Sequence, residues 1–495
     1  MTTPLLDDAG TDRLRTALAA AAYTPAGVYA LLGDAGTAAL ARSELPTVRH
    51  LTSGDDPLAT LVRLFVAGGD APEPPVRAAL APLDLADAYA AGLLERTGDR
   101  VRAGLDLRPY ADDTGAWLVL SDIGSDVRPG PLRPDHVLGI GGASVTLARS
   151  TVRPPVATAL DLGTGCGVQA LHLSRHARSV TGTDVNPRAL RLAATTAALN
   201  GLTWELLAGD LTAPVAGRRF DLVVSNPPFV VGPGRATHTY RDSGRPGDAV
   251  GAELVAAAPK LLTDGGWLQL LANWVHVEDE SWEERVAGWI AGTGCDAWVL
   301  QRELADPAQY VALWLRDSGE LAGPDAEARA AEWLSWFAAQ RIEAVGFGLI
   351  TLWAGGAADP VVHVEEARQA LDQPIGPHVQ AWFSRQDWLR GHELLDARLV
   401  TADALRLQQS ASRGADGWGV DTQVLALDGG LRWAQEVDPL TVALVGGCDG
   451  SVRLGEQLAL LAAAHEAEPA ALAAAALPLV AHLVERGMLL PVAEG

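Results

Sequence analysis

Cysteine and basic side chains are scarce in this chain, and each scarcity excludes a class of protein. The 495 residues include three cysteines, Cys166, Cys295 and Cys448, too few for a disulfide framework at this length. Lysine and arginine number 38 against 61 aspartates and glutamates, which gives a net charge of −23 and a pI of about 4.8. A surface that binds nucleic acid over its whole extent is basic, so the composition argues against one and leaves room only for a local basic patch.

Long apolar segments are also missing. Residues 1–4 begin no basic stretch followed by an apolar core, which is the pattern of a secretory signal. The alanine-rich stretch 469–481 is shorter than a membrane span and is flanked by charged residues. We therefore expect a soluble, cytoplasmic protein with no membrane segment.

Apolar residues make up 48% of the chain and charged residues 20%, which is typical of a globular protein. A chain of 495 residues is too long for one ordinary domain. The residue pattern predicts a helical and winged-helix-like domain over 1–112, an α/β domain over 113–358 with an insert at 303–341, and an α+β domain over 359–495.

The first domain resembles a winged helix in its order of elements. Apolar residues at helical spacing predict three helices, over 58–67, 75–80 and 85–94. A turn at Gly98 predicts a hairpin over 95–103. A DNA reader would place its base contacts on the third helix, which here contains Asp87 and no basic residue. The pattern therefore favours a packing or protein-contact role over DNA reading.

The second domain alternates strands and helices. Short apolar runs predict strands over 157–162, 179–184, 204–208, 220–225, 267–271, 297–301 and 346–353. Such alternation is typical of a doubly wound α/β sheet with helices on both faces. The insert carries aromatic side chains at helical spacing: Tyr310, Trp314, Trp333, Trp336 and Phe337. They could cover a substrate, but packing of the insert onto the fold is the favoured interpretation.

After Pro360 the alternation ends. A helix is predicted over 361–388, followed by a β ribbon with strands over 397–407 and 422–433 and a polar loop, 408–417, between them. Two further helices are predicted over 453–465 and 469–485. The stretch Leu-Val-Glu-Arg-Gly at 483–487 is similar to Leu-Leu-Glu-Arg-Thr-Gly at 93–98. That similarity suggests a second, degenerate winged-helix-like module.

A glycine-rich turn follows the first strand of the α/β domain, with the sequence Asp-Leu-Gly-Thr-Gly-Cys-Gly at 161–167. Glycine lets the backbone turn tightly and approach a ligand without interference from a Cβ. The next helix begins at Val168 and directs its N-terminal amides at that ligand. Asp184 ends the second strand about twenty residues later, where a carboxylate can accept both hydroxyl groups of a ribose. These features predict a nucleotide-type site.

A dinucleotide site is the competing interpretation, and the spacing argues against it. Its fingerprint is Gly-x-Gly-x-x-Gly, whereas the third glycine here falls one position early, at Gly167, with Val168 in the expected place. Asp161 would have no role beside a pyrophosphate, but it suits a ligand that carries a free amino group.

A second motif, Asn226-Pro227-Pro228-Phe229, ends another buried strand further along the chain. With both motifs the chain resembles the class I S-adenosylmethionine-dependent methyltransferases, and in particular the branch that methylates amino or amide nitrogen through Asn-Pro-Pro-(Tyr/Phe). The resemblance covers about residues 155–275. It implies a doubly wound, Rossmann-like methyltransferase sheet and S-adenosyl-L-methionine as the cofactor.

The resemblance also implies roles for individual residues. Those around the methionine part of the cofactor would be Asp161, Gly163, Gly165 and Gly167. Asp184 would bind the ribose, and Asp210 would lie beside the adenine amine. Each of these two acids also has a purely structural interpretation, as the cap of a following turn or helix.

The reacting nitrogen would be held by the second motif. In an exocyclic amine or amide the nitrogen lone pair is delocalised, whereas an in-line displacement at a sulfonium needs that lone pair. The side-chain oxygen of Asn226 and the backbone carbonyl of Pro227 can accept both N–H bonds and orient the nitrogen, and Phe229 offers a flat face for a planar group. Positioning and desolvation then drive the reaction, and no metal is expected.

The loop after this motif carries a local basic run in an acidic chain. It contains Arg235, His238, Tyr240, Arg241 and Arg245. These side chains could bind phosphates, a carboxylate or an acidic peptide. A solvated loop with Arg241–Asp242 and Arg245–Asp248 pairs is an equal alternative.

The acceptor stays open between two classes. The Phe form of the motif resembles the ribosomal RNA exocyclic-amine methyltransferases, and the Tyr form is commoner in the release-factor glutamine and adenine-DNA enzymes. This favours RNA slightly, whereas the acidic net charge and the lack of a basic arm oppose it. We expect an RNA exocyclic-amine methyltransferase, with a protein-glutamine or small-molecule N-methyltransferase as the alternative. The sequence indicates no oligomeric state.

Overall fold

The computed structural model describes residues 2–130, 132–234, 239–240, 242, 244–321, 323–415 and 417–492. The chain divides into two compact units. The first contains residues 1–148 and 154–367, and the second contains residues 149–153 and 368–495. The first unit thus includes the predicted winged-helix-like and α/β regions.

An eight-stranded sheet forms the centre of the first unit, with the strand order β13-β11-β12-β10-β9-β6-β7-β8. Its strands are β6 (Val156–Leu162), β7 (Ala177–Asp184), β8 (Glu205–Ala208), β9 (Phe220–Ser225), β10 (Leu262–Val277), β11 (Asp296–Ala305), β12 (Ile342–Trp353) and β13 (Val362–Glu366). Neighbouring strands are parallel except that β12 runs antiparallel to β10 and β11. The predicted doubly wound α/β sheet is confirmed.

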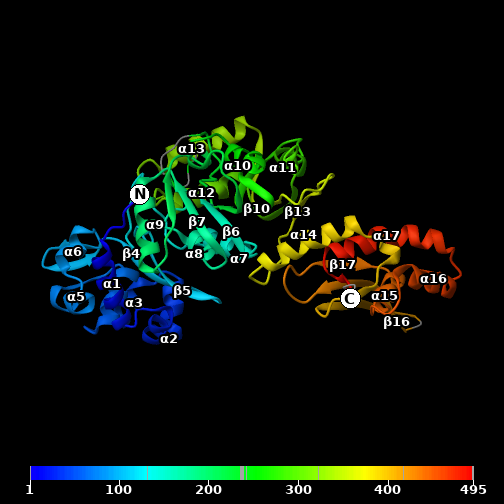
Figure 1. The fold of residues 1–495 in the computed structure, drawn as a ribbon, viewed down its shortest axis with the longest axis horizontal. Helices are drawn as coiled ribbons and strands as arrows, with labels where there is room; N and C mark the ends of the chain where they lie inside the picture. The colour runs from blue at the N-terminus through cyan, green and yellow to red at the C-terminus, as the bar shows by residue number, and fades with distance from the viewer. Residues whose placement is uncertain are drawn as a thin grey trace. The chain divides into compact units, whose positions relative to one another are not determined.

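Helices connect these strands and pack against the sheet (Figure 1). They are α7 (Gly142–Ser150), α8 (Val168–Leu173), α9 (Pro187–Leu199), the short 3-10 turn η2 (Ala213–Val215), α10 (Ala249–Leu261), α11 (Trp282–Ile290), α12 (Pro307–Asp317) and α13 (Ala326–Ala339). In one apolar core cluster, Leu254 of α10 and Ile290 of α11 pack with Leu268 of β10. Burial of these apolar side chains fixes the helices to the sheet.

The N-terminal part of this unit is helical with a small sheet of order β1-β3-β2. Its elements are α1 (Asp8–Ala20), α2 (Pro25–Ala41), α3 (Leu45–Leu51), α4 (Pro57–Leu61), the π-helical turn η1 (Val62–Val66), β1 (Asp70–Pro72), α5 (Glu73–Leu80), α6 (Leu85–Ala90), β2 (Leu94–Thr97) and β3 (Arg100–Ala103). The hairpin β4 (Asp106–Asp112) and β5 (Gly115–Ser121) follows. In the described residues no single helix is long and apolar enough to cross a membrane, although the bent pair α1 and α2 meets that criterion when taken together.

The winged-helix-like hairpin β2–β3 turns at Gly98, whose φ is 61°. Its arginines are neutralised by acids of the same module. Arg96 pairs with Glu73 at 3.6 Å, Arg100 with Asp70 at 2.5 Å, and Arg102 with Glu95 at 2.8 Å. These are exposed surface pairs, and the packing or protein-contact role of the module stays a prediction.

The predicted helix over 361–388 is wrong in its first part. Residues Val362–Glu366 form β13, which pairs in parallel with residues 297–301 of β11 at the edge of the main sheet. Helix α14 begins only at Gly376. The alternation Val-His-Val-Glu suits a strand, and the open sheet edge supplies backbone partners that a local helical pattern cannot reveal.

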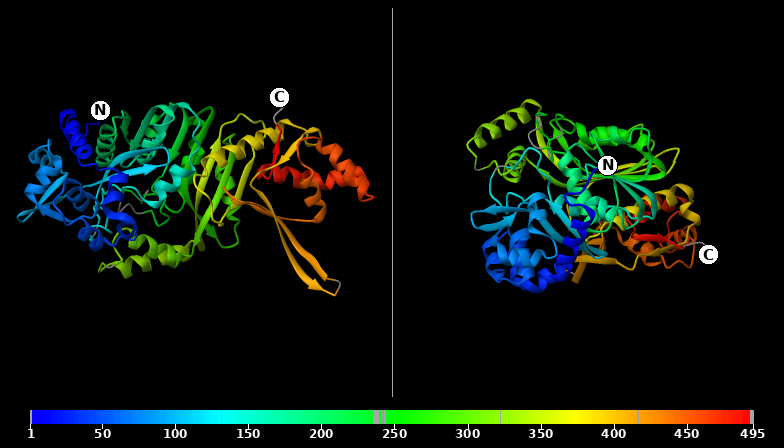
Figure 2. Two further views of the ribbon diagram at one scale, coloured as in Figure 1. Left: turned by 90° about the horizontal axis from the view of Figure 1, so that it is seen from below. Right: turned by 60° about the vertical axis from the view of Figure 1, so that its left-hand side comes forward.

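The second unit combines helices with two small sheets. Its elements are α14 (Gly376–Gly391), η3 (Leu394–Asp396), β14 (Leu399–Thr401), β15 (Leu405–Gly414), β16 (Gly417–Leu427), β17 (Ala434–Val437), α15 (Pro439–Gly446), α16 (Leu454–Ala464), α17 (Pro469–Glu485) and β18 (Leu489–Pro491). The predicted polar loop 408–417 is wrong, because strand pairing continues to Gly414 and Gly417. The resulting hairpin β15–β16 extends away from the rest of this unit (Figure 2).

Gly348 of β12 lies at a tightly packed position in the sheet. A Cβ at this buried position would lie 2.2 Å from the Leu300 carbonyl oxygen and 2.3 Å from Cη2 of Trp274. We expect Gly348→Ala to lower the midpoint of thermal unfolding, since overpacking a core costs roughly 1–3 kcal/mol. The matched control is Gly288→Ala at an exposed position of α11, where a Cβ meets nothing within 4 Å and alanine favours the helix. Equal midpoints for the two variants, measured by circular dichroism, would contradict this packing.

Candidate functional site

A cavity of about 420 Å³ opens where the central parallel strands end. Residues at the carboxyl ends of β6, β7, β8 and β9 line it: Leu162, Asp184, Gly209 and Ser225. Strand β6 lies between β7 and β9. The chain continues from β6 to β7 on one side and from β9 to β10 on the other, so the direction of the strand order reverses here. Such a switch point is where open α/β sheets bind their ligands.

The glycine turn forms one wall of this cavity. Gly163, Gly165 and Gly167 have φ values of 74°, 56° and 90°, in the left-handed region that favours glycine. Gly163 and Gly165 line the cavity. Gly167 faces away from it, because a Cβ there would lie 2.5 Å from the ring of Trp204.

Asp161 lies beneath the glycine turn and is absent from the cavity lining. Its side chain is 1% exposed, and Oδ2 accepts hydrogen bonds from Thr164 Oγ1 at 2.7 Å and from the Ala170 amide at 3.1 Å. Oδ1 is buried without a hydrogen-bond partner in the described part of the chain. Burial raises the pKa of Asp161 to about 7, although the two hydrogen bonds act in the opposite direction.

Asp184 ends β7 and lines the cavity. Its carboxylate accepts hydrogen bonds from the Gly165 amide at 2.9 Å and from the Asn186 amide at 2.8 Å. Burial raises its pKa. The side chain therefore ties the glycine turn to the start of α9, and a carboxylate has acceptor positions left for a ligand.

Asp210 lies at an exposed part of the cavity lining and pairs with Arg245 at 2.9 Å. Arg245 also pairs with Glu253 at 2.6 Å and does not line the cavity. The predicted Arg245–Asp248 pair is wrong, since Asp248 binds Arg285 at 2.9 Å. Arg245 is thus neutralised twice within the described loop.

The second motif follows β9 directly, and all four of its residues line the cavity. The Oδ1 atom of Asn226 is buried and has no hydrogen-bond partner among the described residues. A buried oxygen that accepts no hydrogen bond destabilises the protein, so a ligand N–H that donates to Asn226 Oδ1 would contribute to binding. Phe229 meets Trp314 edge to face, with ring centroids 6.2 Å apart and an interplanar angle of 69°.

The rest of the predicted basic loop is only partly described. Arg235, His238 and Arg241 lie outside the described residues. Tyr240 lines the cavity, and its hydroxyl donates to Asp317 at 3.2 Å. Its binding role, like those of the other site residues, stays a prediction.

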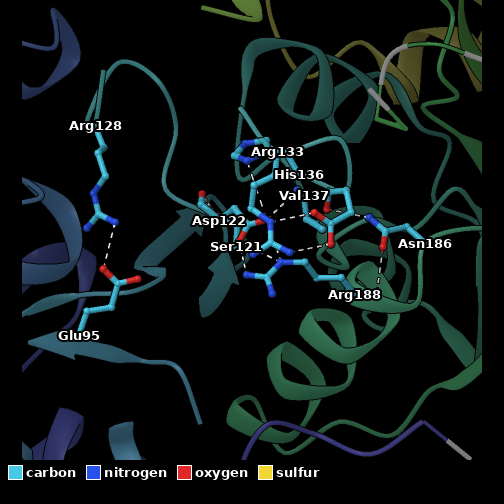
Figure 3. A network of polar contacts seen from close by, with 10 residues as sticks. Glu95, Ser121, Asp122, Arg128, Arg133, His136, Val137, Asn186 and Arg188 are labelled. Atoms are coloured by element: carbon cyan, nitrogen blue, oxygen red, sulfur yellow. Dashed lines mark hydrogen bonds and ion pairs between the residues drawn. The ribbon is translucent and has the colours of Figure 1, made fainter. Parts of the chain in front are cut away.

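Part of the site was missed in the sequence: residues between 122 and 127 and between 136 and 144 line the cavity, and Figure 3 shows the polar contacts of Asp122, His136 and Val137. Buried Asp122 accepts from the Val137 amide at 2.9 Å and from Arg188 Nε at 3.1 Å. The side-chain amide of Asn186 donates to the Asp135 carbonyl at 2.9 Å. The start of α9 therefore holds this segment in place, and no local pattern could reveal contacts between residues so distant in the chain.

The insert contributes to the site as well. Packing, the favoured interpretation, is confirmed for Tyr310 and Phe337, which are 0% and 1% exposed within an apolar cluster. On the same insert, however, Trp314 and Asp317 of α12 line the cavity. The insert thus packs on the fold with most of its aromatic side chains and reaches the site with one.

The cavity is acidic. Among the described residues, six aspartates and one arginine line it: Asp106, Asp122, Asp126, Asp184, Asp210 and Asp317, with Arg108. Arg108 is itself paired with Asp106 at 2.7 Å. In the described ranges no group of three or more potential ligands could hold a metal ion. Asp122 and Asp210 are paired in the same way as Asp106, with Arg188 and Arg245, so these pairs reduce the net negative charge of the described lining.

The middle of the chain matches a known protein family. Residues 142–281 match the methyltransferase small domain, and residues 20–104 and 380–491 match two domains of unknown function, DUF7059 and DUF7782. A ribosomal RNA small subunit methyltransferase C of Alcanivorax borkumensis is 39% identical over 114 residues, 23% of this chain and 31% of that protein. A release factor glutamine methyltransferase of Deinococcus radiodurans is 39% identical over 143 residues, 27% of this chain and 51% of that protein.

The chain therefore covers less than two thirds of the length of either relative. Among solved structures, a 16S rRNA methyltransferase of T. thermophilus in complex with AdoMet and guanosine covers 46% of this chain and 63% of its own, at 20% identity and a TM-score of 0.26. A similarity at that level adds nothing to the sequence matches.

The sheet, the two strand-end motifs and the family match define a class I S-adenosylmethionine-dependent methyltransferase domain. Within that class, the matched residues are similar to ribosomal RNA small subunit and release factor glutamine methyltransferases.

Asp161 should give the ligand-free protein a pH-dependent stability. Its pKa in the folded chain, about 7, lies above the usual 3.8, so the stability it contributes is fully present below that usual value and is lost as the pH rises through about 7. Asp161→Asn places an NH2 group where the protonated acid has its hydroxyl and does not titrate. Because the wild type loses stability between pH 3.8 and about 7 and the variant does not, the melting temperature of the variant minus that of the wild type should rise over this pH range. A constant difference in fluorimetry at a series of pH values would refute the assignment.

Proposed function

We propose that the chain is an S-adenosylmethionine-dependent N-methyltransferase that acts on an exocyclic amine of an RNA base. The observation that carries this proposal is the buried Oδ1 of Asn226 on the cavity wall, which lacks a donor among the described residues. An exocyclic amine brings two N–H donors, so binding one there would satisfy this oxygen. We propose a cytoplasmic location, where both RNA and protein acceptors are found.

The residues present suit the cofactor. A Cβ on Gly165 would meet nothing within 4 Å, so the turn leaves open space beside the backbone. Gly163 and Gly165 would hold the methionine part, Asp184 the ribose and Asp210 the adenine amine. The acidic lining suits a ligand with a sulfonium and an amino group. Asp161 would support the turn from beneath.

The mechanism rests on positioning. When bound, S-adenosylmethionine supplies an electrophilic methyl group on sulfur. Asn226 Oδ1 and the Pro227 carbonyl accept the two N–H bonds of the acceptor and hold its nitrogen in line, while Phe229 supports the planar group. Held in this way, the nitrogen would direct its lone pair at the methyl carbon, and the proton that it loses on methylation would pass to solvent.

A protein glutamine is the second candidate acceptor, and the charge of the site favours it. The cavity lining carries six aspartates, and the arginines of the hairpin β2–β3 are paired with acids. RNA phosphates would have to be bound by other parts of the chain. One relative is named as a release factor glutamine methyltransferase, which agrees with this alternative.

The acceptor is tested by methyl transfer from labelled S-adenosylmethionine into fractionated lysate of a matched deletion strain, divided between ribonuclease and protease treatment. Loss of label with ribonuclease supports RNA, and loss with protease supports the protein alternative. Label that survives both treatments in the small-molecule pool overturns both. Binding of the RNA acceptor should also weaken steeply as the salt concentration rises, whereas a flat response opposes RNA.

Asn226→Ala should separate turnover from cofactor binding. The change removes one of the two acceptors that orient the nitrogen, and misplacement of a reacting group can cost roughly a hundredfold in rate. We expect turnover to fall by about that factor or more, with S-adenosylhomocysteine affinity nearly unchanged in calorimetry. Unchanged turnover would remove Asn226 from the proposed mechanism.

Asp184→Ala should do the reverse. Loss of a charged hydrogen bond costs roughly 1.5–3 kcal/mol, so S-adenosylhomocysteine should bind about ten- to a hundredfold more weakly. Asp221→Ala is the matched control, because Asp221 also accepts backbone amides, from Ala157 and Thr158, but at the opposite end of the strands. Wild-type affinity in Asp184→Ala would exclude the ribose role.

A further inference from the structure

Helix α12 of the insert is fixed to the backbone that follows the Asn-Pro-Pro-Phe motif. The hydroxyl of Tyr310, fully buried, accepts hydrogen bonds from the Val231 amide at 2.8 Å and from the Asn273 side-chain amide at 2.9 Å. Val231 is two residues beyond Phe229. The position of α12 is therefore tied to the motif by direct hydrogen bonds as well as by apolar packing.

One turn after Tyr310, the same face of α12 reaches the cavity. Trp314 is at i+4 and Asp317 at i+7 from Tyr310, which places all three on one side of the helix. Trp314 and Asp317 both line the cavity. Trp314 packs edge to face on Tyr310, with centroids 6.0 Å apart at 64°, so its ring is supported from the buried side.

Trp314 and Phe229 together form an aromatic corner. Their ring centroids are 6.2 Å apart and their planes meet at 69°. A flat ring that stacks on one of them presents its edge to the face of the other, and both offset stacking and edge-to-face contact are favourable. A primary carboxamide on a flexible chain has a planar group of only one carbon, one oxygen and one nitrogen, which can cover one ring at most.

We infer that Trp314 is the side chain that selects an amino group on a heteroaromatic ring over a carboxamide as the methyl acceptor. This inference rests on the proposed N-methyltransferase function and assigns the residue that distinguishes its two candidate acceptors. Phe229 and the acceptors of Asn226 and Pro227 hold the reacting amine, while Trp314 contacts the ring that carries it. Tyr310 acts as a positioning residue because it sets Trp314 relative to the motif.

The test compares ring and amide probes on the full chain loaded with S-adenosylhomocysteine. Guanosine, adenosine and cytidine are the ring probes, N-acetylglutamine amide is the amide probe, and binding is measured by saturation-transfer NMR and titration. The wild type should bind at least one ring probe more tightly than the amide. Trp314→Ala should weaken ring binding about ten- to a hundredfold, the range for loss of one aromatic–base stack, and Trp314→Phe should restore most of it.

Trp336→Ala is the matched control, since Trp336 belongs to the same insert but packs on Phe337 and does not line the cavity. It should leave ring binding unchanged, and all three variants should keep the wild-type affinity for S-adenosylhomocysteine. Tighter binding of the amide, or ring binding that Trp314→Ala leaves intact, would overturn the inference while the methyltransferase function stands. Failure of the wild type to bind S-adenosylhomocysteine would overturn the proposed function and the inference together.

Discussion

The hydrogen-bonded ladder between β6 and its two neighbours is the constraint on which the site depends. Leu162 at the end of β6 is in register with Thr183 of β7 and with Ser225 of β9. The residues that follow these three positions therefore emerge side by side at one edge of the sheet. The glycine turn and Asn226 meet there, and a Cβ on Gly163 would lie 3.9 Å from the Asn226 carbonyl oxygen.

Polar contacts beneath and around this edge hold its irregular backbone. Asp161 binds the turn and the start of α8 from below, and Asp184 binds the turn from the side. Burial raises the pKa of both carboxyl groups, because desolvation disfavours their charged forms. Buried carboxyl groups with perturbed pKa values gather where a ligand is expected to supply compensating interactions.

The charge of the cavity lining affects where the phosphates of an acceptor can lie, and the aromatic side chains affect which reacting group fits. The acidic lining disfavours phosphates close to the reacting atoms, whereas the aromatic corner of Phe229 and Trp314 suits a flat ring. A heteroaromatic amine presented without its backbone phosphates near the cavity would satisfy both conditions. Contacts with the remainder of a large acceptor would then be made outside this cavity.

The sequence by itself determined the sheet and the positions of the turns that line the cavity, because buried strands, glycine-rich turns and strand-end motifs are local patterns. It also indicated Asp161, although it could not tell that this side chain lies beneath the turn instead of on the cavity wall. Only the tertiary structure decided that residues 362–366 complete the sheet, that Arg245 is bound by Asp210 and Glu253, and that Trp314 reaches the cavity. Each of these depends on contacts between residues far apart in the chain, where packing and backbone pairing outweigh the preference of any single segment.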